Sequence, residues 1–365
     1  MTQPELFLPS IVFLPFLAAA LALCLGRIAG RWTGLLMVVA ALASFGQSVQ
    51  LASAGWQGSP IIFTRAWIPI LHITLALRGD PFGLFFSLLI SGIGVLVGVY
   101  SLGYMPSLAP RRLGQYYAAL LGFMGAMLGV ALSDDLVLLF VFWEVTSFTS
   151  FLLIGFWNEQ DEARKGAMTA LQVTAIGGMV MMAGFIIVGL FCGTFSISQL
   201  AGSRDLQLRL ADSALYIPAL LLILAGALTK SAQWPFHFWL PKAMVAPTPV
   251  STYLHAATMM KAGIFLLGRM LPIFGGAAAW MPILVPIGLA TFLMAAYRAF
   301  VESELDIPHH LDRIVHSNYF EPKYPEFQPR TLWSLSNAFT SAFKELEPIP
   351  QYRATARLAG FLATA

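Results

Sequence analysis

The chain has 365 residues, of which 58% are hydrophobic and 11% charged, and its mean hydropathy is +0.75. Soluble globular domains carry about 25% charged residues, so this composition excludes that class and indicates a membrane protein with several spans. The formal net charge of +3 is small and spread along the chain, so nucleic acid is not an expected partner.

Apolar runs long enough to cross about 30 Å of hydrocarbon follow one another along the chain. They cover residues 7–26, 34–54, 82–104, 116–133, 136–156, 167–192, 214–240, 249–271 and 278–299. The sequence therefore predicts an all-α, polytopic helical membrane protein with about nine transmembrane spans, the seventh of them broken. The first run lacks a basic segment and a small-residue cleavage site, so we expect a retained helix and not a removable signal.

Residues 57–80 alternate apolar and polar positions and carry β-branched side chains, which predicts a short hairpin on the outer face. The distribution of basic residues weakly favours an outside amino terminus. With that orientation, the inner loops hold Arg27, Arg31, Arg111, Arg112, Arg164, Lys165, Lys242 and Arg298, and the outer loops hold Arg65, Arg78, Arg204, Arg209 and Arg269.

The composition changes sharply near residue 300, so we predict a membrane domain over 1–300 and a short soluble tail over 301–365. Eight of the eighteen acidic residues and three of the six histidines lie in residues 302–365. One amphipathic helix is predicted around residues 331–347.

Few residues of the chain suit cofactor or metal chemistry. Cys24 and Cys192 lie in apolar runs and are interpreted as small hydrophobic residues, with no disulfide. His309, His310 and His316 lack cysteine or carboxylate partners at zinc-site spacing. We therefore expect no cofactor and no metal.

Glu144 is an acidic residue at hydrocarbon depth, in the segment LVLLFVFWEVTSFTSFLLIGFW. A charge at a helix centre costs at least about 2.5–3.5 kcal/mol, so such residues face the bundle interior and mark ion paths. Ser147 lies one turn further along, so the carboxylate begins a polar strip on one helix face. A proton-handling carboxylate is the favoured interpretation, and a structural ion pair is the alternative.

Lys230 and Pro235 interrupt the seventh run, in GALTKSAQWPFHFWLPKAM. Proline removes an amide donor and clashes with the preceding turn, so carbonyl groups there lose their helical partners. Such backbone at membrane depth has to line a cavity, and broken helices of this kind form ion sites in transporters. The alternative is a simple kink, with Lys230 reaching the membrane interface.

The next span, APTPVSTYLHAATMMKAGIFLLGRM, carries two further basic residues, His255 and Lys261. Thr248 and Pro249 are predicted as its N-cap and first helical residue. Thr258 lies three residues from each base, and a hydroxyl there can bridge them. A histidine in an apolar helix is often only a core residue, and this alternative stays open for His255.

These three segments resemble the antiporter-like subunits shared by respiratory complex I and Mrp-type sodium/proton antiporters, and they are most similar to the large A subunit of the Mrp type. The resemblance implies a helical bundle with a broken seventh helix. It also implies that Glu144 and Lys230 are a coupled acid and base, and that His255 and Lys261 lie on the central proton path. Lys165, at the start of the sixth span, is implied as the basic residue of helix six.

The sequence departs from this family at two places. Val245 stands where the family usually has glutamate. The family core has about fourteen helices in two inverted repeats, whereas nine spans are predicted here, so we expect a chain truncated after about residue 300. Residues 331–361 do not resemble the family. A gene fusion, frameshift or insertion at about residue 300 would explain both the missing second repeat and this unrelated segment.

The expected function is transport and not enzyme catalysis. We expect a subunit of a multisubunit Na⁺/proton antiporter in a bacterial inner membrane, with protons moving along a buried Glu-Lys-His-Lys path. Its partners would be other subunits of the complex, the lipid bilayer, protons and Na⁺. The alternatives are a proton-translocating subunit of a quinone-reducing respiratory complex, and a truncated remnant that acts only as a membrane scaffold.

Overall fold

The structure is a computed structural model and describes residues 3–55, 60–68, 70, 73–105 and 108–305. The chain divides into two compact units, Met1–Thr291 and Phe292–Ala365. Most of the predicted soluble tail lies outside the described residues. This part includes the three histidines of the tail and the helix expected around residues 331–347.

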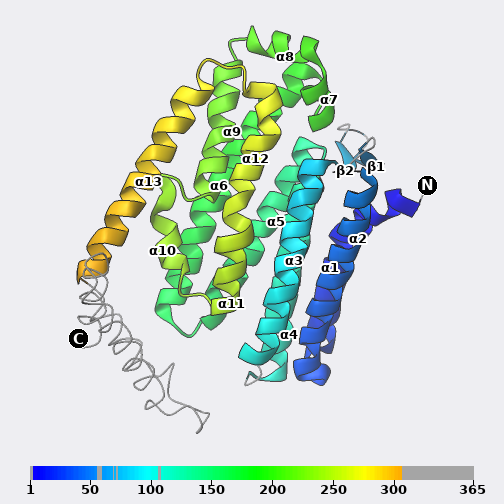
Figure 1. Cartoon of the computed structure of the whole chain (residues 1–365), viewed down its shortest axis with the longest axis vertical. Helices are drawn as coiled ribbons and strands as arrows, with labels where there is room; N and C mark the ends of the chain where they lie inside the picture. Colours follow the sequence, from blue (N-terminus) through cyan, green and yellow to red (C-terminus); the bar gives the residue numbers. More distant parts are fainter. Residues whose placement is uncertain (1–2, 56–59, 69, 71–72, 106–107, 306–365) are drawn as a thin grey trace, which may run out of the picture. The chain divides into compact units, whose positions relative to one another are not determined.

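The described part of the chain is dominated by long apolar helices (Figure 1). They are α1 (Gln3–Ala29), α2 (Thr33–Gly55), α3 (Pro81–Tyr104), α4 (Pro110–Leu132), α5 (Leu136–Ile154), α6 (Asp161–Cys192), α9 (Tyr216–Lys230), α12 (Met259–Phe274) and α13 (Trp280–Leu305). Eight helical segments of the described residues are long and apolar enough to cross a membrane. The bent pair of α8 (Arg204–Ala211) and α9, if counted as one span, gives a ninth. The predicted polytopic helical fold is therefore confirmed for the described residues.

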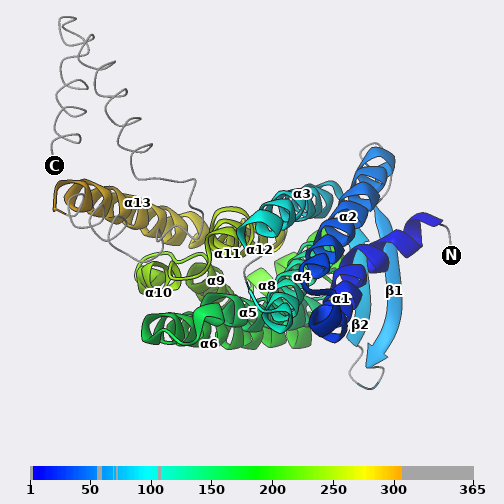
Figure 2. The same ribbon diagram turned by 90° about the horizontal axis from the view of Figure 1, so that it is seen from below.

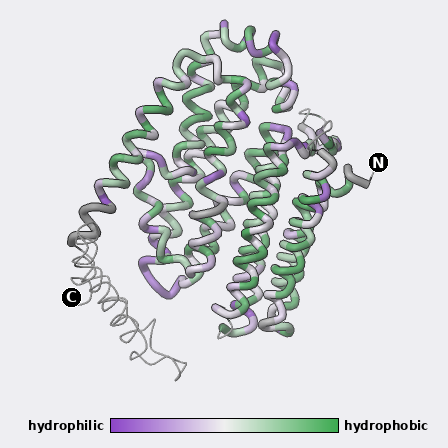
Figure 3. The backbone as a smooth tube through the Cα atoms, in the orientation of Figure 1, coloured by the Kyte–Doolittle hydropathy of each residue, from purple (hydrophilic) through white to green (hydrophobic). Residues whose placement is uncertain are grey.

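The hydropathy of the first unit follows this arrangement. Apolar residues run along its helices, and polar residues gather at the helix ends and in the connecting turns (Figure 3). This distribution suits helices whose outer surfaces face lipid, because polar groups then lie in the headgroup regions at both ends.

Helix α4 is the most deeply enclosed helix of the first unit and contacts α1, α3 and α5 (Figure 2). Its contact with α1 depends on two glycines, because a Cβ on Gly114 would lie 2.7 Å from the Cα of Gly26. Small residues at such crossings let helix backbones approach closely, which is how membrane helices gain packing energy.

The hairpin predicted over residues 57–80 is present as β1 (Ile61–Ile68) and β2 (Ile73–Gly79), which pair antiparallel. Backbone bonds extend this pairing to the turn between α4 and α5. The Asp134 amide donates to the Ala76 carbonyl at 2.9 Å, and the Ile197 amide donates to the Asp134 carbonyl at 2.8 Å. The hairpin is thus tied to the turn and to the short helix α7 (Ile197–Gly202) at one end of the unit.

The seventh span is broken, but the break begins earlier than Pro235. Helix α9 ends at Lys230, and the chain continues through η4 (Phe236–Phe238) into the short helix α10 (Trp239–Ala243). A proline clashes with the carbonyl four residues before it, which here belongs to Ser231. That carbonyl instead accepts a bond from the Gln233 side chain at 3.2 Å.

The eighth span contains a wider helical turn. It consists of α11 (Thr248–Ser251), the π-helical segment η5 (Thr252–Thr258) and α12. The cap position is Pro247 and Thr248 is already helical, so the predicted start was one residue late. The π-helical segment holds His255, and π turns inside α-helices are frequent at functional sites.

Candidate functional site

Lys230 is the only lysine among the largest fully buried side chains of the described residues, with 0% exposure. Its ammonium donates to the Thr146 hydroxyl at 2.6 Å, the Ser147 hydroxyl at 2.8 Å and the Trp143 carbonyl at 3.0 Å. Its Nζ also lies 5.0 Å from the centre of the Trp143 ring, within range of a cation–π interaction. All three protons of a charged lysine therefore have acceptors on α5, which lessens the cost of its burial.

Glu144 lies on α5 between the residues that hold Lys230, but it makes no direct ion pair with that lysine in the described structure. The two charges are close enough to interact. The Oε1 atom of Glu144 is buried and has no hydrogen-bond partner among the described residues. The predicted acid and base are thus brought together as neighbours, and one carboxylate oxygen of Glu144 is buried without a partner among the described residues.

Helix α6 makes room for this carboxylate with two consecutive glycines, Gly177 and Gly178. A Cβ on Gly178 would collide with Oε1 of Glu144 and lie 3.2 Å from the Trp143 ring. A Cβ on Gly177 would collide with the Thr229 hydroxyl, next to Lys230. The glycine pair therefore sets how closely α6 approaches the acid and the base.

His255 is 6% exposed, and neither of its ring nitrogens has a hydrogen-bond partner of good geometry in the described part of the chain. Its ring packs against Trp239 with ring centres 6.0 Å apart, and the Trp239 indole donates to the Thr229 carbonyl at 2.9 Å. His255 is thus linked through Trp239 to the broken end of α9. Thr258 makes no hydrogen bond to either ring nitrogen of His255, and its hydroxyl donates to the Tyr253 carbonyl at 2.6 Å.

The two remaining predicted residues are exposed in the structure. Lys261 lies on α12, one residue after Met260, whose carbonyl accepts the Ser231 hydroxyl at 2.7 Å. Lys165 lies near the start of α6, beside Gly166, which packs closely on the Lys242 backbone. Within the described ranges, neither lysine takes part in the hydrogen bonds that hold Lys230.

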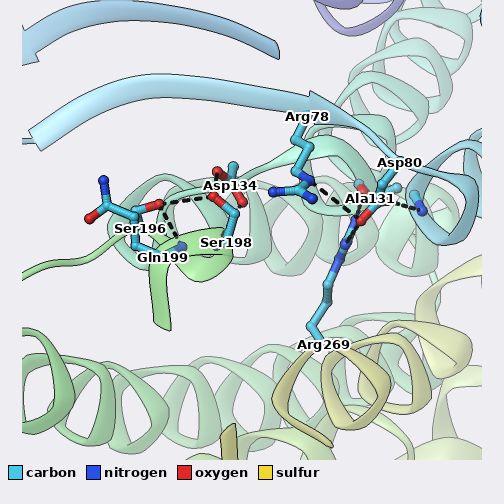
Figure 4. A network of polar contacts seen from close by, with 9 residues as sticks. Arg78, Asp80, Ala131, Asp134, Ser196, Ser198, Gln199 and Arg269 are labelled. Carbon is cyan, nitrogen blue, oxygen red and sulfur yellow. Dashed lines mark hydrogen bonds and ion pairs between the residues drawn. The ribbon is translucent and has the colours of Figure 1, made fainter. Parts of the chain in front are cut away.

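At the hairpin end of the first unit, the structure reveals an ionic cluster that sequence reasoning missed (Figure 4). Arg269, only 9% exposed, makes a short charge-assisted bond and a second bond of 2.9 Å to the Asp80 carboxylate. The guanidinium also donates to the Ala131 carbonyl at 3.3 Å, and Arg78 approaches Asp80 at 3.8 Å. Arg269 was expected to be an outer-loop cation, but it lies inside α12 and faces the protein.

Asp134 belongs to the same region and is 6% exposed. Its carboxylate accepts the Ser198 amide at 3.0 Å and the Ser198 hydroxyl at 2.6 Å.

One sequence signal could have pointed to the Asp80–Arg269 cluster. The pair Asp80–Pro81 is a typical cap and first residue of a helix. Asp80 does cap α3, accepting the Gly83 amide at 2.7 Å.

The two carboxyl groups are expected to give opposite pH dependences of stability. Burial raises the pKa of Asp134, despite the bonds from Ser198. Burial also acts on Asp80, but the bonds and charge of Arg269 outweigh it and lower the pKa of Asp80. A raised pKa in the folded state gives stability that is lost as the pH rises through it, and a lowered pKa gives stability that is lost as the pH falls.

Asp134→Asn should therefore gain thermal stability relative to the wild type as the pH increases from about 4 to about 7, since asparagine can still accept the Ser198 amide bond. Asp80→Asn should lose stability relative to the wild type as the pH increases from about 2 to about 5, because the lowered pKa of Asp80 moves its protonation change to lower pH. Melting temperatures of the purified chain in detergent at several pH values provide the measurement. Parallel pH profiles for the two variants would contradict this assignment.

Comparisons with known proteins identify the family. Residues 133–306 match the family described as "NADH:quinone oxidoreductase/Mrp antiporter, TM", and residues 67–113 match "NADH-Ubiquinone oxidoreductase (complex I), chain 5 N-terminus". Over 292 residues the chain is 44% identical to the A subunit of the Na(+)/H(+) antiporter of Alkalihalophilus pseudofirmus. This chain belongs to the family of antiporter-like membrane subunits. That match covers 80% of this chain and 36% of the relative.

Other relatives agree with this assignment. The chain is 44% identical over 305 residues to the A/B subunit of a probable K(+)/H(+) antiporter of Rhizobium meliloti, covering 82% of this chain and 30% of that protein. It also resembles a chain in the structure of the Mrp complex from Dietzia sp., with 33% identity and a TM-score of 0.67. This alignment covers 78% of the present chain and 30% of that chain. This antiporter-like chain thus spans about a third of the length of the curated relatives that it matches.

The fold is shared with a more distant membrane complex. A chain of the membrane-bound sulfane sulfur reductase, described as an archaeal respiratory membrane complex, aligns with a TM-score of 0.65 and 22% identity. The alignment covers 76% of this chain and 55% of that chain. At this identity the similarity concerns the fold alone.

Proposed function

We propose that this antiporter-like chain is a subunit of a multisubunit monovalent-cation/proton antiporter, and that Glu144, Lys230, His255 and Lys261 carry protons through it. The observation that carries the proposal is the Lys230 site. A fully buried lysine is held by three acceptors beside a carboxylate whose buried oxygen has no partner among the described residues. Ionisable groups inside a membrane protein mark ion paths.

The arrangement supports an electrostatic mechanism. The attraction between a carboxylate and an ammonium is much stronger at low effective dielectric than in water. Protonation of Glu144 removes its negative charge and so weakens the interaction with Lys230. The Lys230 proton then becomes easier to transfer toward the break in α9, where Trp239 and His255 pack together. From there, the proposed path continues to Lys261.

The exposure of Lys261 supports a role inside a larger assembly. A lysine on the outer surface of a membrane-length helix would face hydrocarbon, at a cost of several kcal/mol, unless protein or water covers it. We therefore propose that other subunits enclose this surface, and that the complex lies in a bacterial inner membrane. Lys165 is proposed as a further basic residue near the inner end of α6.

The coupling ion is proposed as a monovalent cation, because the relatives are named as Na(+)/H(+) and K(+)/H(+) antiporter subunits. The test is cation-induced proton flux in everted vesicles from antiporter-deficient cells that produce the chain with its neighbouring subunits. Addition of Na⁺ or K⁺ should collapse a preformed pH gradient, and Glu144→Gln should remove this response. The purified chain alone should show no antiport.

A complete assembly without cation-dependent flux would contradict the proposal and favour the scaffold function. A respiratory-complex subunit is the second candidate, supported by the shared family description. Copurification of a quinone-reducing activity with the chain, combined with proton flux that needs no added Na⁺ or K⁺, would favour that candidate.

A further inference from the structure

The helix that carries Lys261 is fixed to α3 at its outer end. Arg269, near the end of α12, binds the carboxylate of Asp80, the residue that caps α3. The guanidinium also lies against the Phe82 and Phe265 rings, 5.4 Å and 5.1 Å from their centres. Buried, charge-assisted and bidentate contacts of this kind are the strongest polar contacts in proteins, and they fix geometry as well as adding energy.

Gly83 provides the space that this contact needs. A Cβ at Gly83 would lie 2.7 Å from the Arg269 Nη2 atom and 2.7 Å from the Ala131 carbonyl oxygen. The guanidinium therefore fits between the first turn of α3 and the last turn of α4. Figure 4 shows Arg269 entering this space from α12, with Asp80 and Ala131 at its tip.

A second contact fixes the same span to α3 at the start of the π-helical segment, which includes Tyr253. The Tyr253 hydroxyl donates to the Ile90 carbonyl at 2.9 Å, and the Tyr253 ring packs edge-on against Phe123. Tyr253 is fully buried. Tyr253 and Arg269 thus hold the eighth span to one helix at two points, and His255 and Lys261 lie between them.

The π-helical segment makes these two contacts interdependent. The Met259 amide donates to the Leu254 carbonyl, five residues back, which is the backbone geometry of a π-helix. The Thr258 side-chain hydroxyl donates to the Tyr253 carbonyl in the same turn. Conversion of this turn to α-helix would rotate everything beyond it by about 100° and move it by about 1.5 Å. With Tyr253 held, such a change would pull Arg269 away from Asp80.

We propose that Arg269 is a positioning residue, which holds the π-helical segment in place by clamping the outer end of α12 to Asp80. Its effect on transport rests on the function proposed above, because it acts through His255 and Lys261. The clamp itself is a property of the fold and can be measured without transport. It gives a role to an ionic cluster that is remote from the acid and the base.

The test is hydrogen–deuterium exchange on the full chain in lipid nanodiscs, with Asp80→Asn as the main variant. Asparagine is as good a helix cap as aspartate, so α3 keeps its first turn while the bond to Arg269 loses its charge. Amides of residues 252–265 should exchange about tenfold to a hundredfold faster, with α4 and α5 unchanged. Gly83→Ala should accelerate exchange of the same residues, because its methyl group displaces the guanidinium. Since the methyl group also crowds the Ala131 carbonyl, the last turn of α4 should exchange faster as well, and the rest of α4 should not change.

The matched control is Glu159→Gln, since Glu159 pairs with Arg112 at 2.7 Å, away from the Asp80–Arg269 cluster. This control should leave exchange of residues 252–265 unchanged. Unchanged exchange in both Asp80→Asn and Gly83→Ala would overturn the proposal, and so would a uniform increase that includes the whole of α4. Local acceleration without any cation-dependent flux in the wild-type complex would confirm the clamp while rejecting the transport function.

Discussion

Lys230→Met is expected to reduce cation-dependent proton flux at least about a hundredfold, because groups that transfer protons typically contribute a factor of about 10²–10⁴. Methionine fills a similar volume without a charge. The α5 groups that accept hydrogen bonds from Lys230 keep hydrogen bonds to one another in this variant. The Thr146 and Ser147 hydroxyls already donate to the Trp143 carbonyl, at 2.6 Å and 3.3 Å. Glu144 loses its counter-charge in this variant but can become neutral by binding a proton. The variant should therefore still insert and assemble, so that a loss of flux reports the loss of the proton-carrying side chain.

Lys242→Met is the matched control, because Lys242 is an exposed lysine on the short helix α10, just beyond the same break. It should retain flux close to the wild-type value. The measurement is dye-reported proton flux in everted vesicles, normalised to the amount of chain in the membrane. If Lys230→Met kept more than half of the flux, Lys230 would have to be removed from the proposed path.

Gly178→Ala is expected to destabilise the chain by about 1–3 kcal/mol, the usual cost of overpacking a closely packed interior. Its methyl group would collide with Oε1 of Glu144 and crowd the Trp143 ring, forcing α6 away from α5. Because this collision displaces the carboxylate, cation-dependent flux should fall as well. Thermal unfolding in detergent and flux in vesicles are the two measurements.

A double-mutant cycle separates the collision from a general effect of the substitution. Shortening the acid with Glu144→Ala removes the atom that the methyl group would strike. Gly178→Ala should therefore cost much less stability in the Glu144→Ala background, with a coupling of about 0.5–3 kcal/mol. Gly46→Ala, where a Cβ meets nothing within 4 Å, is the control for the substitution itself, and it should gain about 0.5–1 kcal/mol from the lost backbone freedom of glycine. Additive effects of the two substitutions would contradict the proposed packing of Gly178 on Glu144.

Hydrophobic patterning alone determined much of the fold. Long apolar runs can satisfy their backbone in lipid only as helices, so the spans were predictable from the sequence. The hairpin was predictable from its alternation and β-branched residues, and it is present as β1 and β2. The break after Lys230 was also predictable from Pro235, although its start at Ser231 depends on the steric clash four residues back.

The ionisable residues inside apolar runs were equally visible from the sequence, because a charge in such a run is costly and rarely accidental. The sequence pattern does not show which of these residues lie next to one another in the fold. Glu144 and Lys230 lie 86 positions apart in the sequence, and only the packing of the helices made them neighbours. The same packing turned Lys230 toward Thr146 and Ser147 and left Lys261 on the surface, which depends on helix rotation.

The tertiary structure alone decided the roles of Arg269 and Gly178. In the sequence, Arg269 is one more basic residue near a span end, and nothing local distinguishes a lipid-facing arginine from one directed at Asp80. Gly178 is an ordinary small residue in a long helix until α5 places a carboxylate against it. Local sequence determines which segments become helices, because backbone satisfaction and apolar burial are local properties. Contacts between residues far apart in sequence depend on how the helices rotate and cross, and that is decided only when they pack.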